Sequence, residues 1–256
     1  MKILWKSITV WGTNDRQIPV LRRNIVLTNN LALILLLLSL VLALLILAYF
    51  GPVISALMAV GAALLQLSVL LINRFGYPDI GRLLLTMGMP VYTLISALVS
   101  KSPDNFVEEF EYFDTRLIIL STVVLPMIIF DLREKKRLGI ALLITLLCLI
   151  LYDPVHNLFG YGYFQMGLSS GNYPFINYIS VLVWALVTGS MYSLKYQLLK
   201  YERALQEKNT GLASKNTELA GLYSEIEAQN EEIIAQTEEI IEKRDQMQQA
   251  HAIIMM

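Results

Sequence analysis

The sequence predicts an all-α protein, a polytopic bundle of six membrane-spanning helices that continues into a long parallel coiled coil. Of its 256 residues 55% are hydrophobic, and long runs with few charges fill residues 31–194, which is too apolar for one soluble globule. From Leu198 onward an apolar residue recurs at every seventh position, a spacing that produces a left-handed supercoil and requires a partner helix. We therefore expect a cytoplasmic N-terminal arm (1–30), a transmembrane domain (31–194) and a cytoplasmic coiled-coil stalk (195–256).

The N-terminal arm lacks the pattern of a cleavable signal peptide, because Asn14, Asp15 and Arg16 precede the first long apolar run. Its first part, residues 3–11, carries Trp5 and Trp11. We expect this part to lie in the headgroup region as an interfacial anchor or to form a flexible tail.

Four segments are long enough to span a bilayer, which needs about 20 mainly apolar residues. They are residues 31–50, 53–72, 80–100 and 173–194, with a Gly51-Pro52 turn after the first and a kink expected at Pro90. The middle pair, 117–130 and 138–152, is short. It forms either two true spans, the first extended back through Phe113 and Phe110, or a re-entrant hairpin over residues 115–152. We favour two spans.

The basic residues predict the orientation, because lysine and arginine concentrate on the cytoplasmic side of a membrane. The arm, alternate connections and the segment after the last span are basic, whereas the remaining connections hold only Lys101 and Arg116. Six spans with both termini cytoplasmic satisfy this pattern, so we expect an integral inner (plasma) membrane protein.

The stalk carries the predicted dimer seam, nine apolar residues at seven-residue spacing: Leu198, Leu205, Leu212, Leu219, Ile226, Ile233, Ile240, Met247 and Ile254. With this series at position d, asparagine occupies three a positions, a combination that favours a parallel homodimer with a fixed register. Gly211 and Gly221 weaken the first half, since each costs roughly 1 kcal/mol in a helix. This weak half is either a loose spacer or a bistable element. No Pro or Gly separates Met191 from Lys208, so the last span is expected to run into the coil as one helix.

Two groups of polar residues are candidates for function. The first, Asp114, Arg116, Asp153, His156 and Asn157, flanks the middle spans on the predicted outer side, where it would sense a signal or bind a polar ligand. The alternative is that Asp153 turns the chain before Pro154 while His156 lies in the headgroups. The second group is the inner basic turn, Asp131, Arg133, Lys135, Lys136 and Arg137, expected to fix the topology and contact anionic lipid.

Catalytic and cofactor motifs do not stand out in the sequence. It has no P-loop, GxSxG or HExxH pattern, its single cysteine is Cys148, and its two histidines are far apart. We therefore expect no enzymatic activity in this chain, no cofactor, no metal and no nucleic-acid partner.

Three segments carry a resemblance to a known family: Asp114-Thr115-Arg116, the turn from Phe130 to Lys135, and Tyr152-Asp153-Pro154-Val155-His156-Asn157. They resemble the six-helix sensor modules of bacterial receptor-type signalling proteins. The stalk is similar to the linkers that join such modules to an adenylate or guanylate cyclase, a SpoIIE-like phosphatase or a histidine kinase. The resemblance implies a dimeric sensor that controls an output domain, in cis or in trans, outside this sequence.

Two other functions compete with the sensor. The chain would alternatively be a transporter or channel subunit whose coil drives assembly, or a membrane-anchored coiled-coil scaffold. The sequence shows no series of charged residues through the centres of the spans, which disfavours an ion-coupled transporter.

Overall fold

The computed structural model describes residues 2–13, 19–101, 109–169 and 171–254, and these ranges contain helices and no strand, which confirms the all-α class. The chain divides into two compact units, Met1–Tyr196 and Gln197–Met256. The elements are α1 (Lys2–Thr9), α2 (Pro19–Phe50), α3 (Ile54–Arg74), α4 (Pro78–Leu83), the π-helix η1 (Leu84–Gly88), α5 (Met89–Ser100), α6 (Glu109–Ser121), α7 (Val124–Ile129), α8 (Lys135–Ile150), α9 (Tyr152–Leu158) and α10 (Tyr173–Ile254).

The chain has the helices of a membrane protein. Five are long and apolar enough to cross a bilayer, and there are six if α8 and α9, bent by 50° at their junction, form one span. The first middle span extends back to Tyr112, and the second is the bent pair α8 and α9, so the choice between two spans and a re-entrant hairpin stays a prediction. Counting α8 and α9 as one span gives the six that the sequence predicts.

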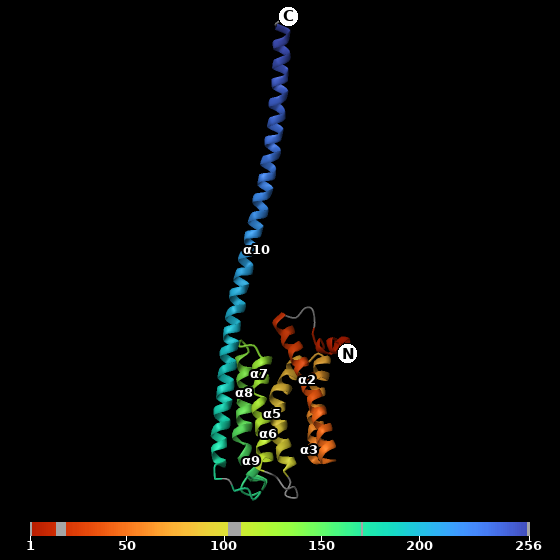
Figure 1. Ribbon diagram of the computed structural model, residues 1–256, viewed down its shortest axis with the longest axis vertical. Helices are drawn as coiled ribbons and strands as arrows, with labels where there is room; N and C mark the ends of the chain where they lie inside the picture. Colours follow the sequence, from red (N-terminus) through yellow and green to blue (C-terminus); the bar gives the residue numbers. More distant parts are fainter. Residues whose placement is uncertain (1, 14–18, 102–108, 170, 255–256) are drawn as a thin grey trace. The chain divides into compact units, whose positions relative to one another are not determined.

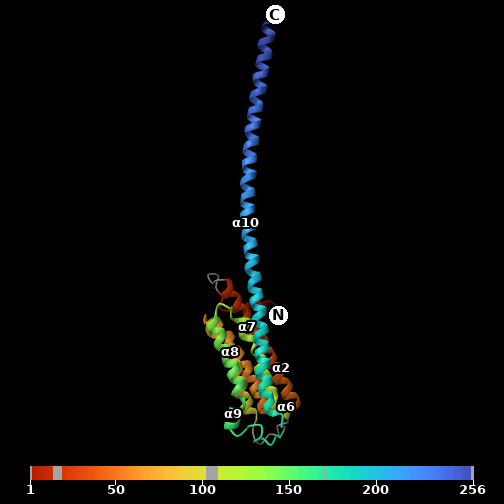
Figure 2. The ribbon, with the colours of Figure 1, turned by 90° about the vertical axis from the view of Figure 1, so that its left-hand side faces the viewer.

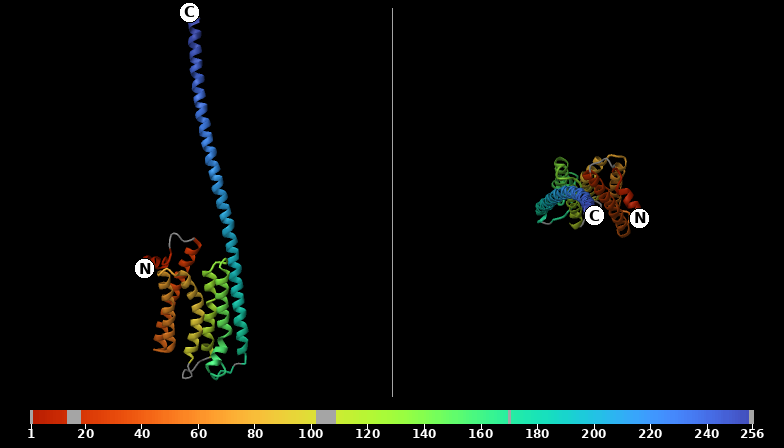
Figure 3. Two further views of the ribbon diagram at one scale, coloured as in Figure 1. Left: turned by 180° about the vertical axis from the view of Figure 1, so that it is seen from behind. Right: turned by 90° about the horizontal axis from the view of Figure 1, so that it is seen from above.

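In the first unit, α2, α3, α5, α6, α8 and the first turns of α10 lie side by side (Figures 1 and 2). Seen from behind, the start of α10 lies beside the green helices, on the side away from α2 and α3 (Figure 3). We call one end of this bundle the aromatic end, because α9 and the buried Tyr112, Tyr152, Tyr163 and Tyr173 lie there. The other is the basic end, where Lys6, Arg74, Arg133, Lys135 and Lys136 are exposed.

Two apolar clusters form the core. The one nearer the basic end contains Leu85, Met89, Leu125, Phe130 and Leu138, and the other gathers the aromatic-end tyrosines around Ile119 and Leu149. Most of the remaining apolar surface points outward, as on α2, whose most apolar stretch is only 11% buried. Leucine exposed in this way suits hydrocarbon, in which it carries no solvation cost.

The N-terminal segment packs on the bundle, so it is not a flexible tail, and its position in the headgroup region stays a prediction. The Asn29 amide donates to the carbonyls of Thr9 (3.0 Å) and Trp11 (2.8 Å), and the Trp5 indole donates to the Asn30 side chain (3.0 Å). The Asn73 amide of α3 donates to Asn29 in turn (2.6 Å). Because α2 already begins at Pro19, the helix extends twelve residues into the predicted arm, and residue 30 marks no structural boundary.

Proline disturbs two spans in ways that the sequence only partly predicts. In the third span the irregularity is the π-turn η1, directly before Pro90, because proline cannot donate to the carbonyl four residues earlier. In the fourth, α6 ends at Ser121 and α7 restarts at Val124, which places Pro126 in the first turn, where no intrahelical donor is needed.

The second unit continues α10 as a helix to Ile254, and Gly211 and Gly221 do not interrupt it. The seam residues from Leu198 to Met247 are all exposed, by 51% at Leu219 to 68% at Met247. The side chain of Ile254 lies outside the described residues, as does that of His251. Pairing with a second copy stays a prediction.

Gly12 offers a test of how firmly the N-terminal segment is docked. Its φ is +78°, and a Cβ would meet the Asn73 carbonyl oxygen at 2.4 Å, whereas Gly51 has nearly the same φ (+76°) and open space around it. A left-handed conformation costs a residue with a Cβ about 1–2 kcal/mol. We expect Gly12→Ala to lower the thermal midpoint in detergent more than Gly51→Ala does. Equal midpoints would show that the Gly12 contact contributes nothing.

Candidate functional site

The central feature of the aromatic end is a buried ion pair. Arg116 of α6 and Asp153, in the first turn of α9, lie 2.6 Å apart between guanidinium and carboxylate, and their side chains are only 2% and 14% exposed. Charges removed from water need hydrogen bonds on every side to be tolerated. The remaining partners come from a third helix.

The first turn of α10 completes this site. The Tyr173 hydroxyl donates to Asp153, the Asn177 amide nitrogen donates to the other Asp153 oxygen (2.6 Å), and Arg116 donates to the Asn177 amide oxygen (2.6 Å). Tyr173 and Asn177 are four residues apart and therefore share one helix face. We call Arg116, Asp153, Tyr173 and Asn177 the buried quartet. It joins α6, α9 and α10.

A buried lysine lies beside the quartet. The Lys101 ammonium donates to the Tyr112 carbonyl (3.0 Å) and to the Tyr152 hydroxyl, and it lies 4.1 Å and 4.8 Å from the centres of these two rings. The Arg116 guanidinium lies 4.4 Å from the Tyr152 ring. Tyr152 is thus within cation–π range of two cations and connects Lys101 to the quartet.

Electrostatics make Lys101 sensitive to pH. Burial lowers the pKa of its ammonium from 10.5 to about 7, and the Arg116 charge adds to this decrease, while the carboxylates of Asp114 and Asp153 oppose it. The side chain is only 3% exposed. A proton on Lys101 therefore binds and leaves near neutral pH rather than in strong base.

The other predicted site residues lie around the quartet without joining it. His156 is fully buried, so the prediction that it lies in the headgroups is wrong; its ring stacks on Tyr152 (4.3 Å), and Nδ1 lies 2.6 Å from the Tyr152 carbonyl. The Asp114 carboxylate accepts from the Thr115 backbone. Asn157 is exposed. Asp104 and Glu108, acidic residues of the preceding connection, lie outside the described residues.

The inner basic turn forms a second polar cluster, at the basic end. The Glu134 carboxylate accepts from Arg82 and from Arg137 (3.0 Å), and Asp79 pairs with both arginines (3.1 Å and 3.0 Å). Arg82 is fully buried and lies over the Phe130 ring. Of the predicted residues, Asp131 accepts from the Arg133 backbone (2.8 Å), Arg137 is ion-paired, and Arg133, Lys135 and Lys136 are exposed.

A lysine of α10 reaches the end of α7 next to this cluster. The Lys195 ammonium donates to the carbonyls of Met127 (2.6 Å) and Phe130. Met127 lies in the last turn of α7 and Phe130 caps this helix, where carbonyl acceptors lack intrahelical donors and a cation is favourable. The bundle therefore holds α10 by polar contacts at its aromatic end, through the quartet, and at its basic end, through Lys195.

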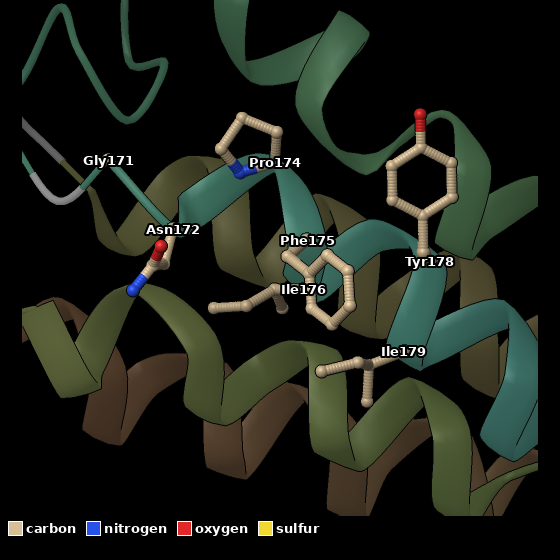
Figure 4. Close-up of a pocket in the computed structure, with 7 residues that line it drawn as sticks. All are labelled: Gly171, Asn172, Pro174, Phe175, Ile176, Tyr178 and Ile179. Atoms are coloured by element: carbon tan, nitrogen blue, oxygen red, sulfur yellow. The ribbon is translucent and has the colours of Figure 1, made fainter.

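A separate, open hollow of about 630 Å³ lies along the first turns of α10 (Figure 4). Its lining is mainly apolar: Gly171, Asn172, Pro174, Phe175, Ile176, Tyr178 and Ile179. None of the quartet lines it, because Tyr173 and Asn177 lie on the bundle-facing side of the helix. Within the described ranges, no three His, Cys, Asp or Glu side chains are grouped to hold a metal ion.

Sequence reasoning found Arg116 and Asp153 but missed Lys101, Tyr152, Tyr173 and Asn177. Tyr173 and Asn177 do show a signal, a polar pair at i and i+4 in the first turn of an apolar span. Lys101 shows none, because a single lysine next to a span end is ordinarily assigned to the headgroup region.

Double substitution tests the ion pair. Breaking a buried pair costs about 3–5 kcal/mol because the remaining charge is uncompensated, whereas replacing both partners with apolar residues costs much less. We expect Arg116→Met and Asp153→Leu each to lower the free energy of unfolding in detergent strongly. The double variant should be more stable than the sum of the two losses predicts by more than about 1 kcal/mol. Leu117→Met, on the exposed neighbour, is the control. Strict additivity would contradict a coupled pair.

The pH dependence of stability tests Lys101. The unfolded lysine holds its proton up to pH 10.5, but the folded one releases it near pH 7, so the unfolded state binds more protons between these values. The folded state is then expected to gain stability as the pH rises through this window. We predict that the thermal midpoint rises more steeply between pH 7 and 9 in the parent chain than in Lys101→Met. Identical slopes would exclude this titration.

No family model, curated protein or solved structure matches this chain. The buried quartet, its neighbouring lysine and the apolar stripe of α10 are therefore the observations on which a function rests.

Proposed function

We propose that this chain is a dimeric sensory module of a membrane signalling protein. A signal at the aromatic end changes the contacts of the buried quartet, the last span shifts, and the stalk relays the shift to a cytosolic output domain in cis or in trans. One observation carries this proposal: the helix that contains the predicted dimer seam begins in the quartet, where Tyr173 and Asn177 hold it to Asp153 and Arg116.

The quartet has the properties of a two-state element. Arg116 and Tyr173 are buried, Asp153 and Asn177 are partly buried, and each removed partner leaves a charge or an amide without compensation, so intermediate arrangements are unfavourable. Interactions of this type change between discrete arrangements rather than gradually. A stimulus that supplies or removes one partner of Asp153 would therefore favour a different position of α10.

The distribution of charge supports the proposed orientation. Exposed cations lie at the basic end, where α10 leaves the bundle at Lys195, whereas Lys101 and Arg116 at the aromatic end are buried. By the positive-inside rule, the basic end and both termini are cytoplasmic, at the inner membrane. There Arg133, Lys135 and Lys136 would contact anionic lipid headgroups.

The positions of the ionisable residues along the spans favour a sensor over a transporter. The ionisable clusters of the described spans lie near the two ends of the bundle, whereas transporters place substrate and ion sites near the bilayer midplane. A membrane-anchored scaffold would also have a coiled coil. Unlike a sensor, a scaffold does not require that the quartet influence the pairing of this coil.

Cysteine crosslinking in membranes separates the sensor from the scaffold. In a Cys148→Ala chain, cysteines at Leu212 and Ile233 report pairing of the stalk. We expect Asn177→Ala, which removes a quartet contact, to change the crosslinking yield severalfold because α10 is no longer held at its outer end. The matched control is Tyr178→Ala, the exposed next residue. Yields that stay constant in Asn177→Ala and under all applied stimuli would favour the scaffold.

A further inference from the structure

We infer that Lys195 marks the place where one stripe of α10 changes its partner, from the chain's own bundle to a second copy of the chain. The inference rests on the proposed dimer and adds where its pairing begins. The side of α10 that carries Lys195 can serve the bundle or the second copy, but not both.

The first step is the heptad register. Counting back in sevens from Leu198 gives Met191, Trp184 and Asn177, and counting back from the a position Glu202 gives Lys195. The a and d positions of the predicted coil thus continue into the last span.

The second step is what these positions do in the span. Asn177 belongs to the buried quartet, Trp184 packs against the apolar cluster of the aromatic end, and Met191 packs against the cluster nearer the basic end. The d positions that would continue the dimer seam therefore pack against the chain's own bundle, whereas the a positions Val181 and Pro174 are exposed. At these positions the bundle takes the place of a partner helix.

The third step is the contact that ends this arrangement. Lys195 donates to the Met127 and Phe130 carbonyls, and the Met127 carbonyl is available because the Asp131 backbone N–H donates to the Glu134 carboxylate instead (3.2 Å). Lys195 is thus fixed on the bundle side of the helix by acceptors that the inner basic turn leaves open.

Helix geometry then forces a choice. A straight helix drifts by only about 20° per heptad against a seven-residue repeat, so Leu198 projects in nearly the same direction as Met191. Because α10 is one helix, a second copy that packs on Leu198 must approach the side of the helix that carries Lys195. Pairing of the stalk is therefore expected to be weak at Leu198 and strong farther along, at Ile233. Release of Lys195 lets the pairing extend toward the membrane.

The test compares two crosslinking positions in membranes that contain the full chain with Cys148→Ala. A cysteine at Ile233 should crosslink severalfold more than one at Leu198. Lys195→Met, which removes the ammonium and keeps an apolar stem, should raise the yield at Leu198 severalfold and leave Ile233 unchanged. Lys200→Met is the matched control, since Lys200 is exposed on the same helix. Lys195→Arg, which retains donors, should behave like the parent.

Equal yields at Leu198 and Ile233 in the parent chain would overturn the inference, and this comparison does not depend on whether Lys195→Met folds. An unchanged Leu198 yield in folded Lys195→Met, with a thermal midpoint that confirms folding, would overturn it too. Absence of crosslinking at Ile233 in every variant would overturn the dimer itself. These outcomes distinguish failure of the proposed dimeric sensor from failure of the inference that Lys195 limits where pairing begins.

Discussion

The Arg116–Asp153 ion pair is the interaction on which the aromatic end depends. Two opposite charges are held 2.6 Å apart in an apolar environment, so their remaining hydrogen-bonding capacity must be met by protein groups. Tyr173 and Asn177 of α10 meet it, and the Tyr152 ring covers the guanidinium and connects it to Lys101. The three helices, which also pack together through the tyrosines of the aromatic end, are thus joined through one carboxylate. The same requirement makes the site sensitive, since no partner can leave without cost.

Polar contacts at both ends and apolar contacts between them hold α10 to the bundle. The quartet fixes its first turn, Trp184 and Met191 pack along its length, and Lys195 contacts the end of α7. A change at the first turn therefore acts on a helix whose other polar restraint in the described bundle is Lys195. This lysine occupies an a position of the heptad series, so the restraint and the dimer seam use one side of the helix.

The fold follows from sequence far better than the site does. Hydrocarbon thickness and helix rise determine the spans, and heptad spacing predicts the seam, because both are local periodicities. The site depends on which polar side chains meet across helices, and no local pattern contains this information. Arg116 and Asp153 were recognisable as charges at span ends. For His156 the sequence left a sensing role and a place in the headgroups open, and the structure buries the ring against Tyr112 and Tyr152. Lys101 and Lys195 resembled ordinary interfacial lysines until their carbonyl acceptors were known.

The central claim is that the quartet and the stalk are coupled. Hydrogen exchange of the full chain in lipid nanodiscs, compared between the parent and Asp153→Asn, tests it most directly because this substitution removes the charge and keeps the shape. The account predicts altered exchange both in the first turns of α10 and in the stalk beyond residue 222, with Val155→Ala, a neighbouring change in α9, leaving the stalk as in the parent. Altered exchange confined to the aromatic end, with the stalk unaffected, would contradict it.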